Sequence, residues 1–126
     1  MGSRKEKPGG NILMITVEAL KKYGANVEEG LARCMNNEVL YLKLVGMAAD
    51  EENFDRLHAA LEQKNLKDAF EAAHALKGVI ANLAITPLHE KIAEITELLR
   101  AETDMDYTKL EEDISNKREE LKKLMQ

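Results

Sequence analysis

One histidine in this sequence has neighbours suited to nucleophilic chemistry. His74 is followed by Lys77 after three residues and by Gly78 after four. In a helix these residues share one face, because positions three and four apart lie one turn from each other. The glycine leaves open space beside the imidazole, and the lysine adds a positive charge. The spacing therefore indicates a site at which His74 carries an anionic group.

The apolar residues around His74 predict the helix that would hold it. They recur at alternating spacings of three and four, which is typical of a helix packed in a bundle. Asn65 is suited to cap its start, and Asp68 is favourable in its first turn. Gly78 is the least ordinary residue, because a glycine inside a helix costs about 1 kcal/mol relative to alanine. The apolar positions are Leu66, Ala69, Ala73, Leu76, Ile80 and Leu83.

Further helices are predicted on both sides of this one. Asn36 and Asn37 interrupt the apolar pattern after a short helix that ends near residue 35, and they can cap the helix that follows. Thr86 and Pro87 mark another start, with a hydroxyl N-cap followed by proline at the first helical position. Two short helices are expected at about 16–23, ended by Gly24, and at 26–35. Longer ones are expected at about 38–63, at 65–83, from Thr86 and from about Tyr107.

The predicted helix at 38–63 contains a polar patch at residues 50–53. We interpret it as one long helix, bent near Gly46 or the patch, because the apolar period continues in phase through it. A loop at the patch is the alternative. The apolar positions are Leu40, Leu44, Met47, Phe54, Leu57 and Leu61.

These helices predict an all-α fold of one domain. Each long helix has a single apolar stripe and the connections are short, which favours an antiparallel up-and-down four-helix bundle with one or two short N-terminal helices. The domain is expected to span residues 12–126. Residues 1–11 are basic and rich in glycine, and we interpret them as a flexible leader, with cloning as one explanation of its origin.

Composition limits the classes of function. The 126 residues are 44% hydrophobic and 33% charged, with a net charge of −5, which argues against general nucleic-acid binding. The single Cys34 excludes an internal disulfide and fits a reducing compartment. No apolar run of membrane length and no signal peptide is present. We expect a cytoplasmic protein that buries its apolar stripes as a monomer.

The chemistry open to His74 is phosphoryl transfer. A neutral imidazole can attack a phosphoryl group, and the phosphoramidate that forms can pass the group on. Lys77 would offset the negative charge, and Gly78 would avoid a clash with the group. Because phosphoryl transfer depends mainly on positioning and charge stabilisation, a partner with Mg²⁺ could supply most of the catalysis. The chain itself is expected to hold no metal and no other cofactor.

The residues 73–78, Ala-His-Ala-Leu-Lys-Gly, resemble the signature of histidine-containing phosphotransfer (HPt) domains of two-component phosphorelays. The resemblance extends to Val27–Arg33, to the helix start at Glu38–Leu42 and to Asn82-Leu83, and covers the chain from about residue 13. One departure is Ala84, where the family often has glycine. We expect it to alter the helix end slightly without loss of function.

The resemblance implies a phosphoprotein of signal transduction. His74 would be the phospho-acceptor, supported by Lys77 and Gly78, and would exchange its phosphoryl group with aspartates of response-regulator receiver domains. A sensor histidine kinase would stand in the same pathway, and Mg²⁺ would be bound by the receiver. The chain would be a carrier and no enzyme in its own right.

Two other classes of function are compatible with a helical bundle of this composition. The first is a helical adaptor that binds a receiver or another signalling partner without being phosphorylated. The second is an enzyme, for which the sequence has no P-loop, no kinase glycine-rich loop and no paired-carboxylate motif. The complete set of His74, Lys77 and Gly78 favours the carrier over the adaptor.

A docking patch for the partner is predicted around His74. It consists of small and apolar residues with a charged rim, which would tune the choice of receiver. If the chain reverses at Lys64-Asn65, then Phe54, Asp55 or His58 would flank the site, depending on the face that each takes. The predicted patch comprises Lys67, Phe70, Glu71, Ala81 and Asn82 together with Lys77 and Gly78.

Overall fold

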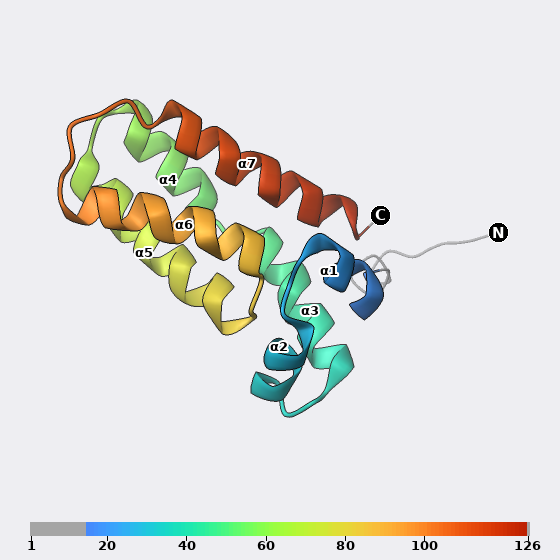
Figure 1. Ribbon diagram of the computed structural model, residues 1–126. Helices are drawn as coiled ribbons and strands as arrows, with labels where there is room; N and C mark the ends of the chain where they lie inside the picture. Colours follow the sequence, from blue (N-terminus) through green and yellow to red (C-terminus); the bar gives the residue numbers. More distant parts are fainter. Residues whose placement is uncertain (1–14, 126) are drawn as a thin grey trace.

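The computed structural model describes residues 15–125, which form seven α-helices joined by short connections (Figure 1). The predicted all-helical fold is confirmed, and the predicted leader 1–11 lies outside the described residues. The helices are α1 (Val17–Tyr23), α2 (Val27–Arg33), α3 (Glu38–Ala49), α4 (Asn53–Glu62), α5 (Leu66–Asn82), α6 (Thr86–Arg100) and α7 (Thr108–Lys123).

Helices α4 to α7 form an up-and-down bundle, and α1 to α3 gather at one end of it (Figure 1). Within the bundle, α5 packs against both α4 and α6, and α6 also packs against α7. The predicted apolar stripes of α5 and α6 are largely buried there, as apolar surface removed from water is the main source of stability. The most deeply buried side chains include Leu57, Leu76, Ile80, Leu88, Ile92, Ile95, Leu99 and Leu121.

The prediction of one long helix at 38–63 is wrong, and the loop at the polar patch is what the structure contains. Helix α3 ends at Ala49 and α4 begins at Asn53. The carboxylate of Glu51 accepts a hydrogen bond from the backbone N–H of Asn53 at 2.8 Å. On the other side of the break, Arg118 of α7 donates to the carbonyl of Ala49 at 2.8 Å. The side chains of Glu51 and Arg118 therefore provide partners for backbone groups at both ends of the break.

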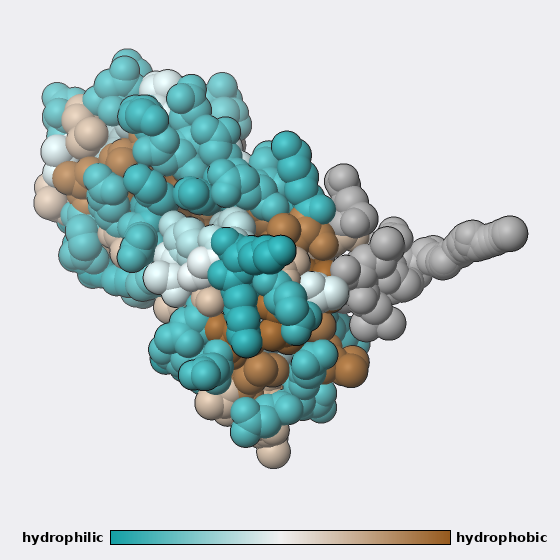
Figure 2. Space-filling view, turned by 45° about the vertical axis from the view of Figure 1, so that its right-hand side comes forward, coloured by the Kyte–Doolittle hydropathy of each residue, from teal (hydrophilic) through white to brown (hydrophobic). Residues whose placement is uncertain are grey.

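The buried face of α3 also differs from the face that the sequence predicted. Its packed residues are Tyr41, Leu42, Val45, Gly46, Ala48 and Ala49. The predicted apolar positions Leu40 and Met47 are 38% and 56% exposed instead. Helix α3 is thus apolar on two sides. The residues used to predict one long helix lie mainly on the side that the fold leaves exposed. Figure 2 shows hydrophobic residues at the surface of the part built by α2 and α3, whereas the visible face of the bundle is mostly hydrophilic.

The predicted helix ends are mostly confirmed. Gly24 ends α1 with a φ of 115°, a left-handed conformation that glycine adopts without strain. The side chains of Asn26 and Asn37 cap α2 and α3. Thr86, however, is the first residue of α6 and not its N-cap, which is Ile85. The Thr86 hydroxyl donates to the carbonyl of Ala84 at 3.3 Å instead of accepting from a helix N–H.

A tyrosine ties the N-terminal helices to the end of α5. Tyr41 of α3 is fully buried, and its hydroxyl donates to the carbonyl of Leu83 at 2.9 Å. Burial, and to a smaller extent Cys34, raises the pKa of Tyr41 to about 12. A Cβ on Gly30 of α2 would lie 2.4 Å from the Cε1 atom of this ring. Only glycine at position 30 lets α2 approach the tyrosine so closely.

Among residues 15–125, no helix is both long enough and apolar enough to cross a membrane.

The contact between α4 and α7 predicts a pH-dependent contribution to stability. His58 contacts the carboxylate of Glu111, and this hydrogen bond is the main reason why the pKa of His58 is raised. A raised pKa adds stability that is complete below the unfolded value, about 6.5, and is lost as pH rises through the folded value. Both side chains are partly exposed, so the contribution is roughly 0.5 kcal/mol.

The measurement compares the free energy of unfolding of wild type and Glu111→Gln from pH 5 to pH 9. The two proteins are expected to differ at pH 5 and to converge at high pH. A difference that stays constant across this range would contradict the assignment, and His89→Gln serves as a control away from the pair.

Candidate functional site

His74 is exposed at the middle of α5, on the side opposite the bundle core. Its neighbours Ala73 and Leu76 are fully buried, which holds the helix behind it. As predicted, the side chain of Asn65 caps α5 by accepting from the backbone N–H of Asp68 at 3.1 Å. The helix is thus held by its cap and by its packed side, while the imidazole faces outward.

The two predicted supporting residues have different surroundings. Gly78 is exposed, and a Cβ placed on it would have no neighbouring atom within 4 Å outside its own helix backbone. The glycine is therefore not required by packing. Lys77 is half-buried, and its Nζ atom lies 3.7 Å from a carboxylate oxygen of Glu97 on α6. An ammonium group and an open space therefore both lie one turn after the imidazole.

The structure places the predicted docking patch on one face of α5. Lys67, Glu71 and Asn82 are exposed, whereas Phe70 and Ala81 are half-buried. Their spacings from His74 are multiples of three to four residues, so they lie along the same side of the helix. The ring of Phe70 stacks on the imidazole of His74, with centroids 5.6 Å apart and an interplanar angle of 16°.

The expectation that Phe54, Asp55 or His58 would flank His74 is wrong. All three line a hollow between α4 and α7. The reversal at Lys64-Asn65 is real, with Lys64 at a φ of 57°, but counting residues from a turn sets only the level along the helix and not the face. From α4, Arg56 instead forms ion pairs with α5.

Arg56 joins two acidic side chains on α5. Its guanidinium lies 2.5 Å from a carboxylate oxygen of Asp68 and 3.1 Å from one of Glu71. The hydrogen bond to Asp68 is the main reason why the pKa of Arg56 is raised. Glu71, one turn before His74, is therefore partly neutralised from α4.

Helix α6 contributes two residues that sequence reasoning missed. Arg100 lies with its guanidinium 4.9 Å from the centroid of the Phe70 ring. It also donates to Glu97 through Nε at 3.3 Å, and this hydrogen bond is the main reason why the pKa of Glu97 is lowered. A signal existed, because counting outward from the α5–α6 turn places Arg100 nearly level with Phe70.

The end of α5 explains the departure at Ala84. This residue has a φ of 56°, the left-handed conformation in which glycine is the usual residue. The backbone N–H of Ile85 donates to the carbonyl of Ile80 at 3.3 Å and completes the helix end. Alanine therefore adopts the conformation that a glycine would have, at a steric cost of about 1 kcal/mol.

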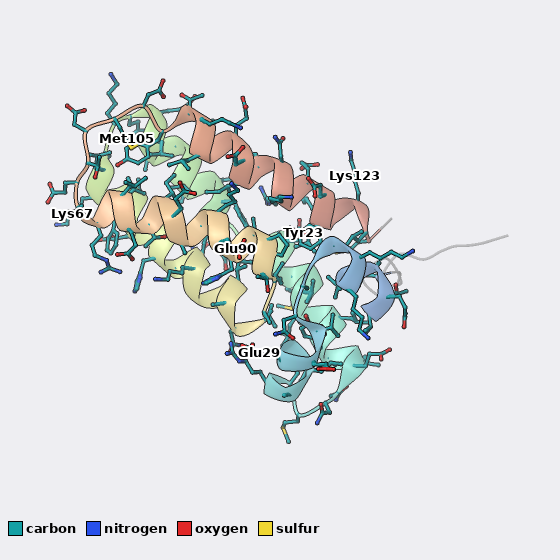
Figure 3. The ribbon with its side chains drawn as sticks, viewed as in Figure 1. Tyr23, Glu29, Lys67, Glu90, Met105 and Lys123 are labelled. Carbon is teal, nitrogen blue, oxygen red and sulfur yellow. The ribbon has the colours of Figure 1, made fainter. Side chains whose placement is uncertain are left out.

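The face around His74 ends against α2. Arg33 of α2 donates to the carbonyl of Ala81 at 2.8 Å and pairs with Glu29. Figure 3 labels Glu29 on α2, near the end of α5, and Lys67 near its start, so the two labels mark the length of this face. Among residues 15–125, no group of three or more His, Cys, Asp or Glu side chains lies close enough to hold a metal ion.

Comparison with known proteins assigns the family. The model of the Hpt domain family matches residues 47–126, which is most of the chain, and the chain therefore belongs to this family. No curated protein and no solved structure matched it. The match covers the end of α3 and the whole bundle α4–α7, whereas the resemblance seen in the sequence also included α1 and α2. Hpt domains carry phosphoryl groups in two-component signalling, and the class of protein predicted from the sequence is confirmed.

Proposed function

We propose that this chain relays a phosphoryl group between His74 and the aspartates of receiver domains. The observation that carries the proposal is the exposed imidazole, with open space beside Gly78 and the ammonium of Lys77 one turn away. A second protein can approach such a side chain from solvent, while the packed side of α5 keeps the helix in place. Membership of the Hpt family supports the same role.

The transfer would proceed by attack of a ring nitrogen of His74 on the phosphorus of an aspartyl phosphate. The N–P bond forms as the P–O bond breaks, and the aspartate leaves with the electron pair. The positively charged ring then releases the proton on its other nitrogen to water. The reverse reaction passes the group to another receiver. Lys77 would stabilise the negative charge, and Mg²⁺ on the receiver would do the same from the partner's side.

The remaining parts of the proposal concern the pathway. A sensor histidine kinase would supply the phosphoryl group through a receiver, and the chain would act as a cytoplasmic monomer with no cofactor of its own. The patch formed by Lys67, Phe70, Glu71, Ala81 and Asn82 would contact the receiver. The family assignment supports a kinase and receivers as partners. The monomeric state, the absence of a cofactor and the patch residues are predictions from the sequence.

The test is phosphorylation by a phosphorylated receiver or by a small phosphoramidate donor, followed by mass spectrometry. We expect a gain of about 80 Da for one phosphoryl group, located on His74, lost in acid and retained in base. A folded protein that binds receivers and gains no mass from several donors would overturn the proposal. That result would support the adaptor.

Substitutions at Gly78 separate folding from transfer. Gly78→Ala is expected to raise the free energy of unfolding by about 0.5–1 kcal/mol, because alanine has the higher helix propensity and its Cβ meets no neighbour. Gly78→Gln keeps most of that gain but fills the space beside His74. We expect it to slow transfer from a receiver about tenfold or more, which is the factor that corresponds to the cost of overpacking the contact with the receiver.

Chemical unfolding, monitored by circular dichroism, measures the effect of these substitutions on stability. Single-turnover transfer measures their effect on the rate. A Gly78→Gln variant that is both stable and as fast as wild type would show that the space beside His74 is not used by the partner.

A further inference from the structure

We infer that Arg100, on α6, is a positioning residue for the imidazole of His74 and acts on it through the ring of Phe70. The inference rests on the proposed function, since it concerns how the phosphoryl-accepting side chain is held. Arg100 is 26 positions from His74 in the sequence, and the packing of α6 against α5 brings it to the site.

The geometry is a chain of three side chains across two helices. The guanidinium of Arg100 lies 4.9 Å from the Phe70 ring centroid, within the distance at which a cation is attracted to an aromatic face. The same ring stacks on His74 at 5.6 Å and 16°. Phe70 therefore contacts an arginine on one helix and the proposed acceptor on its own helix.

This contact matters because His74 is exposed. An exposed side chain changes rotamer on a picosecond to nanosecond timescale, and each alternative rotamer takes the nucleophilic nitrogen away from the incoming phosphorus. Holding a reacting group near its attack geometry lowers the barrier. A ring fixed by Arg100 would restrict the imidazole in this way without blocking its outer side.

The guanidinium of Arg100 is itself held in place. It makes a forked contact with Glu97, one turn earlier on α6, through Nε and Nη2 at 3.3–3.4 Å. Glu97 also pairs with Lys77 at 3.7 Å. The pair of α6 residues thus contacts the side chains that precede and follow His74 by one turn, which are Phe70 and Lys77.

A double-mutant cycle tests whether Arg100 acts through Phe70. Arg100→Ala is expected to slow phosphorylation of His74 by about two- to fivefold, the ratio for an exposed cation–π contact. Phe70→Leu is expected to have at least this effect. In the Phe70→Leu background, Arg100→Ala should change the rate little further, because the ring that connects the two is gone. Arg100→Lys should lie between wild type and Arg100→Ala, since it keeps the cation and loses the planar group.

Effects of Arg100→Ala and Phe70→Leu that simply multiply would overturn the inference, because Arg100 would then act by a route other than the ring of Phe70. So would an Arg100→Ala variant as fast as wild type.

Arg118→Ala is the matched control. Arg118 makes the same kind of contact, 4.4 Å from the ring centroid of Phe54, between α7 and α4. The substitution removes the same charge and the same type of contact at a place remote from His74. We expect it to leave the transfer rate unchanged.

A spectroscopic reading works without any phosphorylation. Protons of an imidazole stacked on a phenyl ring are shifted by the ring current, so the His74 ring resonances of the unphosphorylated protein report the stack. Phe70→Leu should move them to values of an unstacked histidine, and Arg100→Ala should move them part of the way at the same pH. Resonances that do not move in Arg100→Ala would overturn the inference even if wild type proved not to be phosphorylated at all.

Discussion

Replacing His74 by glutamine is expected to abolish phosphorylation of the chain. Glutamine keeps a polar side chain of similar length but has no ring nitrogen able to form an N–P bond. The side chain is exposed, so the substitution should change the free energy of unfolding by less than about 0.5 kcal/mol. The measurement is incorporation of the phosphoryl group from a phosphorylated receiver, followed by mass.

The chain offers two matched controls for this experiment. His58→Gln and His89→Gln make the same chemical change elsewhere, at the contact with Glu111 and on α6. Both should be phosphorylated like wild type. A His74→Gln protein that still relays phosphate, or a loss in either control, would place the acceptor elsewhere.

Replacing Gly30 by alanine is expected to have the largest effect on stability. The new Cβ would lie 2.4–2.7 Å from atoms of the buried Tyr41 ring, and overpacking of this kind costs about 1–3 kcal/mol. Displacing the ring also weakens the hydrogen bond from Tyr41 to Leu83. That loss and the gain in helix propensity are each roughly 1 kcal/mol and offset each other. The free energy of unfolding should therefore fall by about 1–3 kcal/mol.

Gly78→Ala is the matched control for Gly30→Ala, since both exchange a helical glycine for alanine. Urea unfolding followed by circular dichroism should give opposite signs for the two variants. Equal changes, or a stabilised Gly30→Ala protein, would mean that α2 does not depend on its close approach to Tyr41.

Local patterns in the sequence predicted the helices around the site. The spacing of apolar residues gave α5 and α6, and the caps at Asn26, Asn37 and Asn65 were readable because a side-chain acceptor must lie next to the helix start that it serves. The class of fold followed from short connections between helices with one apolar stripe each. These features depend on residues close together in the chain.

The predictions that were wrong depend on contacts between residues far apart in the sequence. The break between α3 and α4 is held by Arg118, which donates to the carbonyl of Ala49 from α7. The apolar period through the polar patch gave no sign of it. The same limitation placed Phe54 and His58 beside His74, although both face α7.

The sequence by itself determined the helical class, the position of His74 beside the apolar stripe of its helix, and the family to which the motif belongs. Only the tertiary structure decided what surrounds that histidine: Arg56 from α4, and Glu97 with Arg100 from α6. The physical reason is that a helical period fixes which residues of one helix share a face. Which faces of two helices meet, and at what register, depends on side-chain packing across the whole bundle.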